Sequence, residues 1–212
     1  MRGRVAIVLL FCVRAGGAGE GVAYHGLSVR LDPKAHAIEV IDSMGGIGSF
    51  RLHEGLSVEG LDGASAERLG EVLGGAVPLR EYRLSTVKRS IRNAVRYKGT
   101  IHHPLEAQAE EYARSFSETP GTISEEGVFL GGASGWYPVA GDELVTFTLE
   151  VDLPKDWDAV SQGVRTRHEV VGDRRIVTWE CKDPTEEIYL VAAPFTEYGR
   201  GNAFAFLRTP DP

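Results

Sequence analysis

Hydrophobic and polar residues alternate with a period of two along much of the chain. From Val145 to Leu153, for example, every second side chain is apolar, which is the arrangement of a β-strand that buries one face. Turn-forming pairs such as Asp32-Pro33 separate the alternating segments. The pattern predicts strands at 24–31, 37–41, 50–52, 56–58, 90–101, 144–153, 176–179 and 188–192.

Two segments have instead the roughly 3.6-residue period of a helix. Residues 64–73 (ASAERLGEVL) carry Ser65 in a capping position, and residues 104–116 (PLEAQAEEYARSF) begin with a proline, which is favoured in a first helical turn. We expect each segment to form a short helix between strands. Because no internal repeat is present, the prediction is a single all-β domain, an antiparallel β-sandwich or saddle with one or two short helical insertions.

The N-terminus has the three parts of a secretory signal peptide. Arg2 and Arg4 are positively charged, residues 5–13 (VAIVLLFCV) are apolar, and residues 16–18 (GGA) are small enough for cleavage by a signal peptidase. Residues 1–18 are therefore expected to be removed, leaving a β domain of residues 19–212 that is periplasmic or extracellular. A buried first strand is the alternative interpretation of the same residues.

The composition narrows the classes of partner. The chain has 212 residues and a formal net charge of −7, whereas a nucleic-acid partner would favour a basic face. No segment reaches the roughly 20 apolar residues of a membrane-spanning helix. Cys12 would leave with the signal peptide, so Cys181, in an alternating segment, is expected to be a small core residue without a disulfide partner.

The histidine motifs lack the spacing of a metal site. His53 and His168 are each followed by Glu, which begins the zinc-binding motif H-E-x-x-H, but neither has a second histidine one helical turn later. We expect both to be solvent-facing polar positions. His102 and His103 are adjacent, so their side chains should point to opposite faces of a strand and should not share a metal.

The glycine-rich stretch 131–135 (GGASG) does not complete a catalytic pattern. Ser134 lacks the G-x-S-x-G spacing of a hydrolase nucleophile, and no Lys-Ser or Lys-Thr pair follows to bind phosphate. We interpret the stretch as a tight bend that glycine permits. The chain is therefore expected to have no catalytic residue, metal ligand or cofactor of its own.

The order of several short motifs is more informative than any one of them. These motifs are YHGLSVRLDP at 24–33, FRLH at 50–53, LSV at 56–58, YKGTI at 97–101, WYP at 136–138, LVTFTLEVDLPK at 144–155, SQG at 161–163 and IYLVA at 188–192. In this order the chain resembles, over residues 22–207, the N-terminal domain of the aminopeptidase N family of zinc metallopeptidases.

The resemblance implies a non-catalytic role for this chain. The domain would pack on a downstream catalytic domain and wall one side of the cleft that binds the peptide substrate. Zinc and the hydrolytic residues are expected in that catalytic domain, which this sequence does not contain. The whole protein would then be an exported aminopeptidase.

The resemblance also implies a contact with the substrate's free amine. Members of the family carry an acidic or amide residue for this contact some residues before the aromatic-aromatic-Pro motif. Gly127, Val128 and Phe129 occupy the corresponding positions here. Glu125 or Glu126 would therefore have to make the contact instead.

Trp136, Tyr137 and Pro138 form the aromatic-aromatic-Pro motif itself. The resemblance places them at the cleft or at the interface with the catalytic domain. A tryptophan is also highly buried on average, so a core position for Trp136 is the alternative. For the chain as a whole, the alternative is a free-standing exported β-sandwich module that binds peptide or glycan through loops or an exposed strand edge.

Overall fold

The computed structural model describes residues 21–45, 48–61, 64–72, 75–86, 93–104, 106–108, 116–201 and 203–208. The expected signal peptide, residues 1–18, lies outside these ranges together with Cys12, so its removal stays a prediction. The described residues form strands almost throughout, which confirms the all-β fold class. None of the described helices is long and apolar enough to cross a bilayer.

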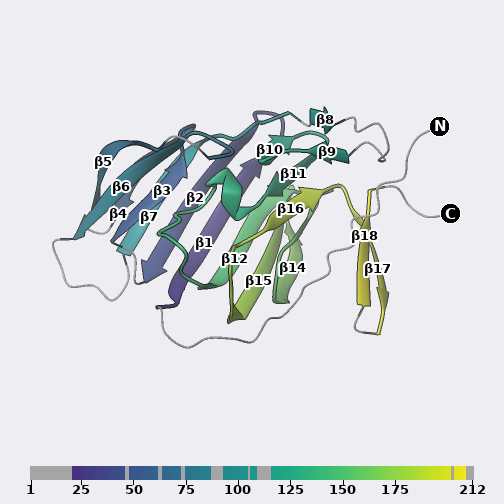
Figure 1. Cartoon of the computed structure of the whole chain (residues 1–212). Coiled ribbons are helices and arrows are strands. Elements are labelled where there is room, and N and C mark those ends of the chain that lie inside the picture. The colour runs from purple at the N-terminus through teal and green to yellow at the C-terminus, as the bar shows by residue number, and fades with distance from the viewer. Residues whose placement is uncertain are drawn as a thin grey trace.

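A seven-stranded sheet is the largest layer (Figure 1). Its strand order is β14-β15-β12-β1-β2-β7-β4, and neighbours run antiparallel except β1 and β12, which are parallel. The strands are β1 (Ala23–Asp32), β2 (Ala37–Gly45), β4 (Leu56–Leu61), β7 (Asn93–Thr100), β12 (Val145–Pro154), β14 (Val164–Val171) and β15 (Arg174–Thr185).

Two smaller sheets and two hairpins complete the described structure. The four-stranded sheet has the order β10-β11-β16-β13 and the three-stranded sheet the order β3-β6-β5. Their strands are β3 (Ser49–His53), β5 (Ala64–Val72), β6 (Leu79–Thr86), β10 (Gly121–Ser124), β11 (Gly127–Leu130), β13 (Asp158–Val160) and β16 (Leu190–Ala193). The hairpins are β8 (Glu106–Gln108) with β9 (Phe116–Glu118), and β17 (Thr196–Arg200) with β18 (Ala203–Leu207).

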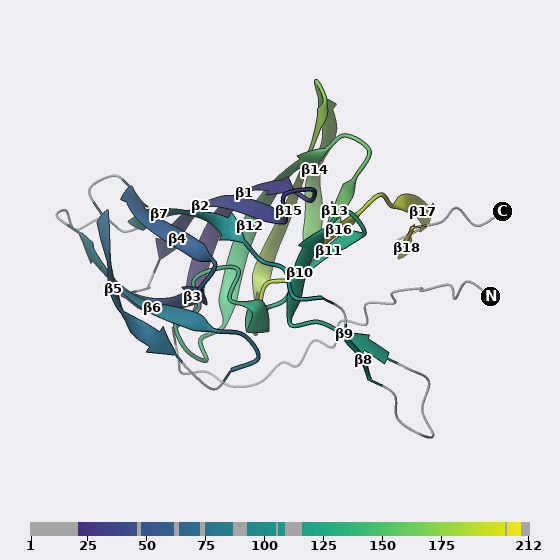
Figure 2. The ribbon, with the colours of Figure 1, turned by 90° about the horizontal axis from the view of Figure 1, so that it is seen from above.

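The core lies on one face of the seven-stranded sheet. Along β12 every second residue from Val145 to Leu153 is buried, as the sequence alternation predicts. The buried side chains of β3, β11 and β16 belong to the same hydrophobic cluster as those of β1 and β12. Since only one face of β1 is fully buried, the smaller sheets pack on that face, and Figure 2 shows this arrangement from above.

The described residues of 64–73 and 104–116, the two segments for which helices were expected, form strands and not helices. Residues 64–72 form β5, which pairs antiparallel with β6 around an irregularity between Arg68 and Gly70. Both ends of the segment 104–116 are short strands, β8 and β9, and residues 109–115 lie outside the description. A short helical period competes with cross-strand pairing, and at β5 the pairing prevails. The only described helical element is a 3₁₀ turn, η1 (Gly132–Ser134).

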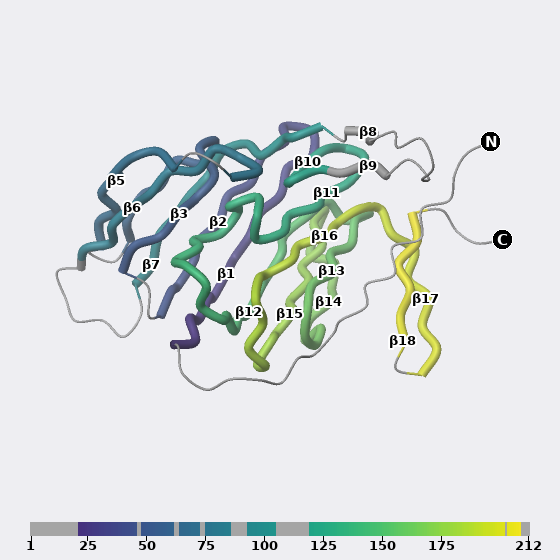
Figure 3. Tube along the Cα trace, viewed as in Figure 1, coloured from purple at the N-terminus to yellow at the C-terminus, as the bar shows by residue number. Residues whose placement is uncertain are grey.

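The β17–β18 hairpin stands beside the larger sheets, and its strands pair only with each other, as the trace in Figure 3 shows. Phe195 precedes the hairpin and packs against Phe206 of β18, with the ring centroids 6.0 Å apart. Phe204, also in β18, is 59% exposed. The hairpin is therefore attached to the domain through its base and through the polar contacts described below.

Candidate functional site

Glu125 and Glu126 form the tip of the β10–β11 hairpin. Both side chains are exposed, and neither makes an ion pair with a described residue. The turn is closed by Ser124, whose hydroxyl donates to the carbonyl oxygen of Gly127 at 3.1 Å. The tip thus presents two free carboxylates to solvent, and a contact with a substrate amine stays a prediction.

The bend at 131–138 is held in a conformation that requires glycine. Gly135 has a φ of 62°, and a Cβ at this position would lie 2.4 Å from Leu79 Cδ2 and 2.9 Å from the backbone nitrogen of His53. The bend follows η1 and leads directly into Trp136 and Tyr137. The sequence interpretation of a tight, glycine-permitted bend is therefore confirmed.

The segment 187–190 fixes the bend through three hydrogen bonds. The backbone N–H of Gly132 donates to Glu187 Oε2 at 2.6 Å, and Trp136 Nε1 donates to the carbonyl oxygen of Ile188 at 3.1 Å. The backbone N–H of Ile188 donates to the hydroxyl of Tyr137 at 3.3 Å. Desolvation raises the pKa of Tyr137 to about 12, so its hydroxyl is neutral.

Trp136, Tyr137 and Pro138 are all buried within this chain. Trp136 is 0% exposed, and its indole N–H is satisfied inside the domain. A side chain without exposed surface cannot contact a second domain unless the bend opens. The burial therefore supports the core position for Trp136 that the sequence left as the alternative, and the placement of the motif at the cleft or at the domain interface stays a prediction.

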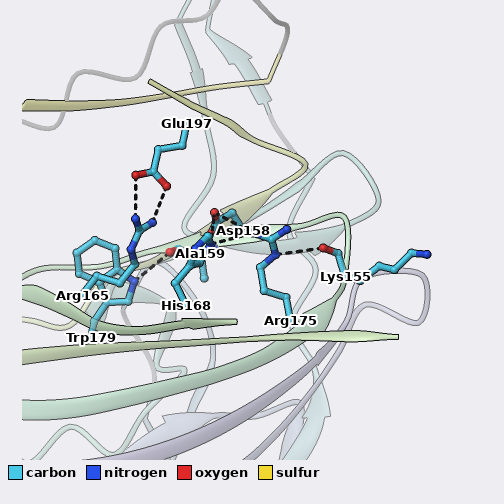
Figure 4. A network of polar contacts seen from close by, with 8 residues as sticks. All are labelled: Lys155, Asp158, Ala159, Arg165, His168, Arg175, Trp179 and Glu197. Carbon is cyan, nitrogen blue, oxygen red and sulfur yellow. Dashed lines mark hydrogen bonds and ion pairs between the residues drawn. The ribbon is translucent and has the colours of Figure 1, made fainter. Parts of the chain in front are cut away.

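A cluster of polar side chains joins β13, β14, β15 and β17 (Figure 4). Ligand atoms of Asp158, His168 and Glu197 lie within 4.8 Å of one another, as in no other described group of three such residues. Asp158 Oδ2 is 2.8 Å from His168 Nε2, and Asp158 Oδ1 accepts from the backbone N–H of Ala159 at 2.8 Å. The sequence did not bring these residues together, because they come from three different strands.

Two arginines occupy the same cluster. Arg165 donates to both carboxylate oxygens of Glu197, at 2.7 and 2.8 Å, and its guanidinium lies 6.0 Å from the ring centroid of Trp179. This hydrogen bond lowers the pKa of Glu197. Arg175 Nη1 lies 3.6 Å from Asp158 Oδ2. Each carboxylate thus already has a cationic partner, so a divalent cation would be repelled, and the cluster acts as an ion-pair network.

A second His–Asp pair lies in the core. His25 Nδ1 of β1 is 2.7 Å from Asp42 Oδ2 of β2, and the two side chains are 1% and 0% exposed. The ring of Tyr137 meets His25 edge to face at a centroid distance of 5.3 Å. Asp42 Oδ1 and the hydroxyl of Tyr97 are buried without a partner among the described residues, and burial with the nearby Asp42 charge raises the pKa of Tyr97.

His53 and His103 form a third polar pair that the sequence did not predict. Their Nε2 atoms are 2.9 Å apart, and His53 Nδ1 accepts from the backbone N–H of Gly55 at 2.9 Å. Burial, His103 and Arg80 lower the pKa of His53 to about 4. His53 is buried, so the expectation of a solvent-facing position was wrong for it, whereas His168 lies at the surface with its side chain 30% exposed.

The pattern contained one signal for the His25–Asp42 pair. His25 falls on the apolar face of its strand between Ala23 and Leu27, and Asp42 falls between Val40 and Met44 on the apolar face of the next strand. Polar residues at core-facing positions of adjacent strands require a partner, and each of these residues is the other's partner. The signal identifies a buried pair but not its register.

The chain has similar proteins among solved structures but not among protein families or curated sequences. No protein family and no curated protein matches the chain. Among solved structures, native yeast LTA4 hydrolase has a TM-score of 0.54 at 13% identity, over 85% of this chain and 30% of that chain. The same hydrolase in complex with bestatin has a TM-score of 0.52 at 15% identity, over 84% and 29%. An M1 zinc metallopeptidase from Deinococcus radiodurans has a TM-score of 0.46 at 15% identity, over 87% and 46%.

The chain spans less than half the length of these solved structures. At such low identity, the two hydrolase matches show a shared fold. The resemblance to a β domain of the aminopeptidase N family is thus confirmed at the level of the fold.

Proposed function

We propose that this chain is the non-catalytic N-terminal domain of an exported, aminopeptidase-like zinc metallopeptidase. It would pack on the catalytic domain and wall the peptide-binding cleft. The observation that carries the proposal is the unequal coverage of the fold match, which takes in 85% of this chain but only 30% of the yeast hydrolase. A β domain that accounts for under a third of such an enzyme leaves room for a separate catalytic domain.

The side-chain chemistry of the described residues supports a non-catalytic role. The carboxylates of the Asp158–His168–Glu197 group are each paired with an arginine, which leaves no open position for a catalytic zinc. Zinc for hydrolysis would therefore belong to the catalytic domain. Within this chain, the exposed Glu125 and Glu126 are the candidates for contact with the substrate amine.

The size of the native protein tests the proposal most directly. An antibody raised against residues 19–212 should detect, in the exported fraction of the source organism, a protein much larger than this chain. Material of the size of the chain itself would contradict the proposal. Mass spectrometry of the exported protein should give an N-terminus near Gly19, and a retained Met1 would contradict export through a cleaved signal.

Activity of the isolated chain gives the second test. The purified domain, supplied with zinc, should not release aniline from aminoacyl anilides, because the described residues include no open zinc site with a general base. Zinc-dependent turnover would contradict a non-catalytic role.

One observation favours the alternative of a free-standing binding module. Strand β14 is an outer strand of the large sheet, and Val164, Val170 and Val171 on it are more than half exposed. An unpaired edge of this kind can add an extended peptide as a further strand. Native protein of the size of the chain, together with peptide binding that is lost in Val170→Lys, would establish this alternative.

A further inference from the structure

The two outer strands of the large sheet, β4 and β14, have different surroundings (Figure 2). β4 is in contact with β5, the strand that follows it in the chain. β14 pairs with β15, and no other described strand pairs with it. In the described part of the chain, no backbone hydrogen bond outside the strand ladders involves residues 164–171. The edge of β14 that faces away from β15 is therefore open.

This open edge carries a row of backbone hydrogen-bonding groups. From Arg167 to Val171 the pairing with β15 is regular, so every second residue directs its N–H and C=O toward β15. The residues between them direct these groups to the open edge. Val164, Val170 and Val171 on the same strand are more than half exposed. An exposed edge strand with apolar side chains is a template for pairing with another extended segment.

The charges on β14 favour one kind of partner strand, a second copy of itself. Arg167 and Glu169 lie on the same face of β14 and form an ion pair there, with their side chains 43% and 49% exposed. Two copies of a strand that pair antiparallel meet in reverse order. If His168 lies opposite His168 of the second copy, Arg167 of each copy lies opposite Glu169 of the other. Oppositely charged residues in directly opposed positions stabilise a strand pair.

The neighbouring registers match less well. With Glu169 opposite Glu169 of the second copy, like charges meet directly, which destabilises a strand pair. In the register centred on His168, Thr166 instead lies opposite Val170, and both are β-branched residues suited to a pleated surface. The irregularity in β14 between Arg165 and Arg167 falls at the ends of this contact, so the regular pairing is short.

We propose that β14 is a dimerisation edge, which pairs antiparallel with β14 of a second copy of this chain in the register centred on His168. The two large sheets then form one continuous sheet across a two-fold axis, and every contact occurs twice. A single short strand gives an interface at the small end of the known range, so monomer and dimer are in a concentration-dependent equilibrium. This inference goes beyond the proposed function and does not depend on a catalytic domain.

Charge reversal tests the pairing directly. The purified chain of residues 19–212 is studied by sedimentation over a wide range of concentration, and we expect the dimer fraction to rise with concentration. Glu169→Arg places arginine opposite arginine, and Arg167→Glu places glutamate opposite glutamate. Each variant alone should dimerise at least about tenfold more weakly than the wild type. An equimolar mixture of the two variants restores opposite charges at both positions and should form a heterodimer.

The other outer strand of the same sheet supplies the matched control. Glu59 is an exposed residue of β4, and Glu59→Arg makes the same change of charge as Glu169→Arg. This control should dimerise like the wild type. Thermal melts of all variants show whether they are folded, and recovery of a dimer in the mixture shows it independently.

A pair of cysteine variants tests the register. In the proposed dimer the Cα atoms of His168 and its copy are directly opposed, about 5 Å apart, which a disulfide can bridge. The Cα atoms of Val170 and its copy are four residues out of step, about 13 Å apart, which is too far. Under mild oxidation, His168→Cys should therefore form a covalent dimer and Val170→Cys should not. The native Cys181 is buried.

Three results would overturn the proposal. They are a chain that stays monomeric at every concentration, whether or not its β14 edge binds an extended peptide; dimerisation of Glu169→Arg as tight as that of the wild type; and cross-linking of Val170→Cys as efficient as that of His168→Cys. None of them would alter the size of the native polypeptide on a denaturing gel or its activity toward anilides. The dimer and the proposed function can therefore fail independently.

Discussion

The chain contains two His–Asp pairs of nearly the same length in very different surroundings. His25 and Asp42 are 2.7 Å apart on adjacent central strands, β1 and β2, and both are almost completely buried. His168 and Asp158 are 2.8 Å apart, and His168 lies on the edge strand β14 with its side chain 30% exposed. The same two residue types thus occupy the middle and the margin of the fold.

The surroundings determine what each histidine can do. His168 Nε2 is 2.8 Å from both Asp158 Oδ2 and Arg175 Nη1, so a neutral ring can donate to one or accept from the other, but not both. At the margin of the fold, either Arg175 or solvent can be the hydrogen-bond partner of His168. In the core His25 Nδ1 lies 2.7 Å from Asp42 Oδ2, and this contact fixes a single tautomer of the ring. Burial therefore holds the His25 ring to one tautomer and one carboxylate partner, whereas the His168 ring at the surface can change its hydrogen-bond partner.

Removing the carboxylate from each pair should give the largest difference. Asp42→Ala leaves His25 buried without its partner, and loss of one member of a buried pair costs roughly 3–5 kcal/mol. Asp158→Ala should cost less, about 1–2 kcal/mol, because His168 and Arg175 can be hydrated at the margin. Urea unfolding of both variants measures the two free energies. Equal losses would show that burial does not distinguish the pairs.

The cover over the central pair should matter almost as much. Trp136 packs edge to face on Tyr137, which in turn meets His25, so Trp136→Ala would open the core above the pair. The substitution should cost about 3–5 kcal/mol of unfolding free energy. Trp136→Phe keeps most of the volume but loses the hydrogen bond to Ile188, and should cost about 1 kcal/mol. A melting temperature that is unchanged in Trp136→Ala would restore the interface interpretation.

The strands could be predicted from sequence because their signal is local. The alternation from Val145 to Leu153 specifies a strand with one buried face, whatever its neighbours are. It does not specify the partner, so the parallel pairing of β1 with β12 was not foreseen. The segment 64–72 fails for the opposite reason. Its local period is helical, but β6 pairs with it on both sides of the irregularity between Arg68 and Gly70, and this tertiary pairing overrides the local preference.

The polar sites were harder to predict because their members are distant in sequence. His53 and His103 are 50 residues apart, and their rings meet only because the end of β3 lies beside the segment that follows β7. Cys181 was predictable as a buried residue from the alternation alone, and it is buried. Glu125 and Glu126 were placed by resemblance, and their position at a turn does not identify a ligand. Alternation therefore predicts burial, whereas pairing depends on topology.

His53, in the pair His53–His103, gives the stability of the chain a pH dependence. His53 has a folded-state pKa of about 4 and an unfolded value of 6.5, so the unfolded chain takes up a proton first. Stability should therefore decrease as the pH falls from 6.5 to about 4 and level off below. A protonated His53 would also direct Nδ1–H at the N–H of Gly55.

His53→Asn isolates this contribution, because its amide oxygen can still accept from Gly55 but does not titrate. Unfolding free energies measured at pH 7 and pH 5 should differ less for His53→Asn than for the wild type. His102→Asn, a change at an exposed neighbouring histidine, serves as the control and should keep the wild-type difference. An identical pH dependence in wild type and His53→Asn would show that the pair does not resist protonation.

The smallest effect is expected at the ion pair of Arg165 and Glu197, in the polar cluster that joins β13, β14, β15 and β17. The two side chains are 21% and 24% exposed, so water can replace much of what the ion pair provides, and Glu197→Gln should cost no more than about 1 kcal/mol. The effect on the local stability of the hairpin should be clearer than the effect on the unfolding free energy. The reason is that this bidentate contact links the β17–β18 hairpin, whose strands pair only with each other, to β14. Amide hydrogen exchange in β17 and β18 should therefore accelerate while exchange in β1 and β12 stays the same. Glu169→Gln, on β14 but without a contact to the hairpin, should change neither. Uniform acceleration in all four strands would mean that this polar cluster stabilises the core. The contrast between the buried His25–Asp42 pair and the outer His168–Asp158 pair would then fail.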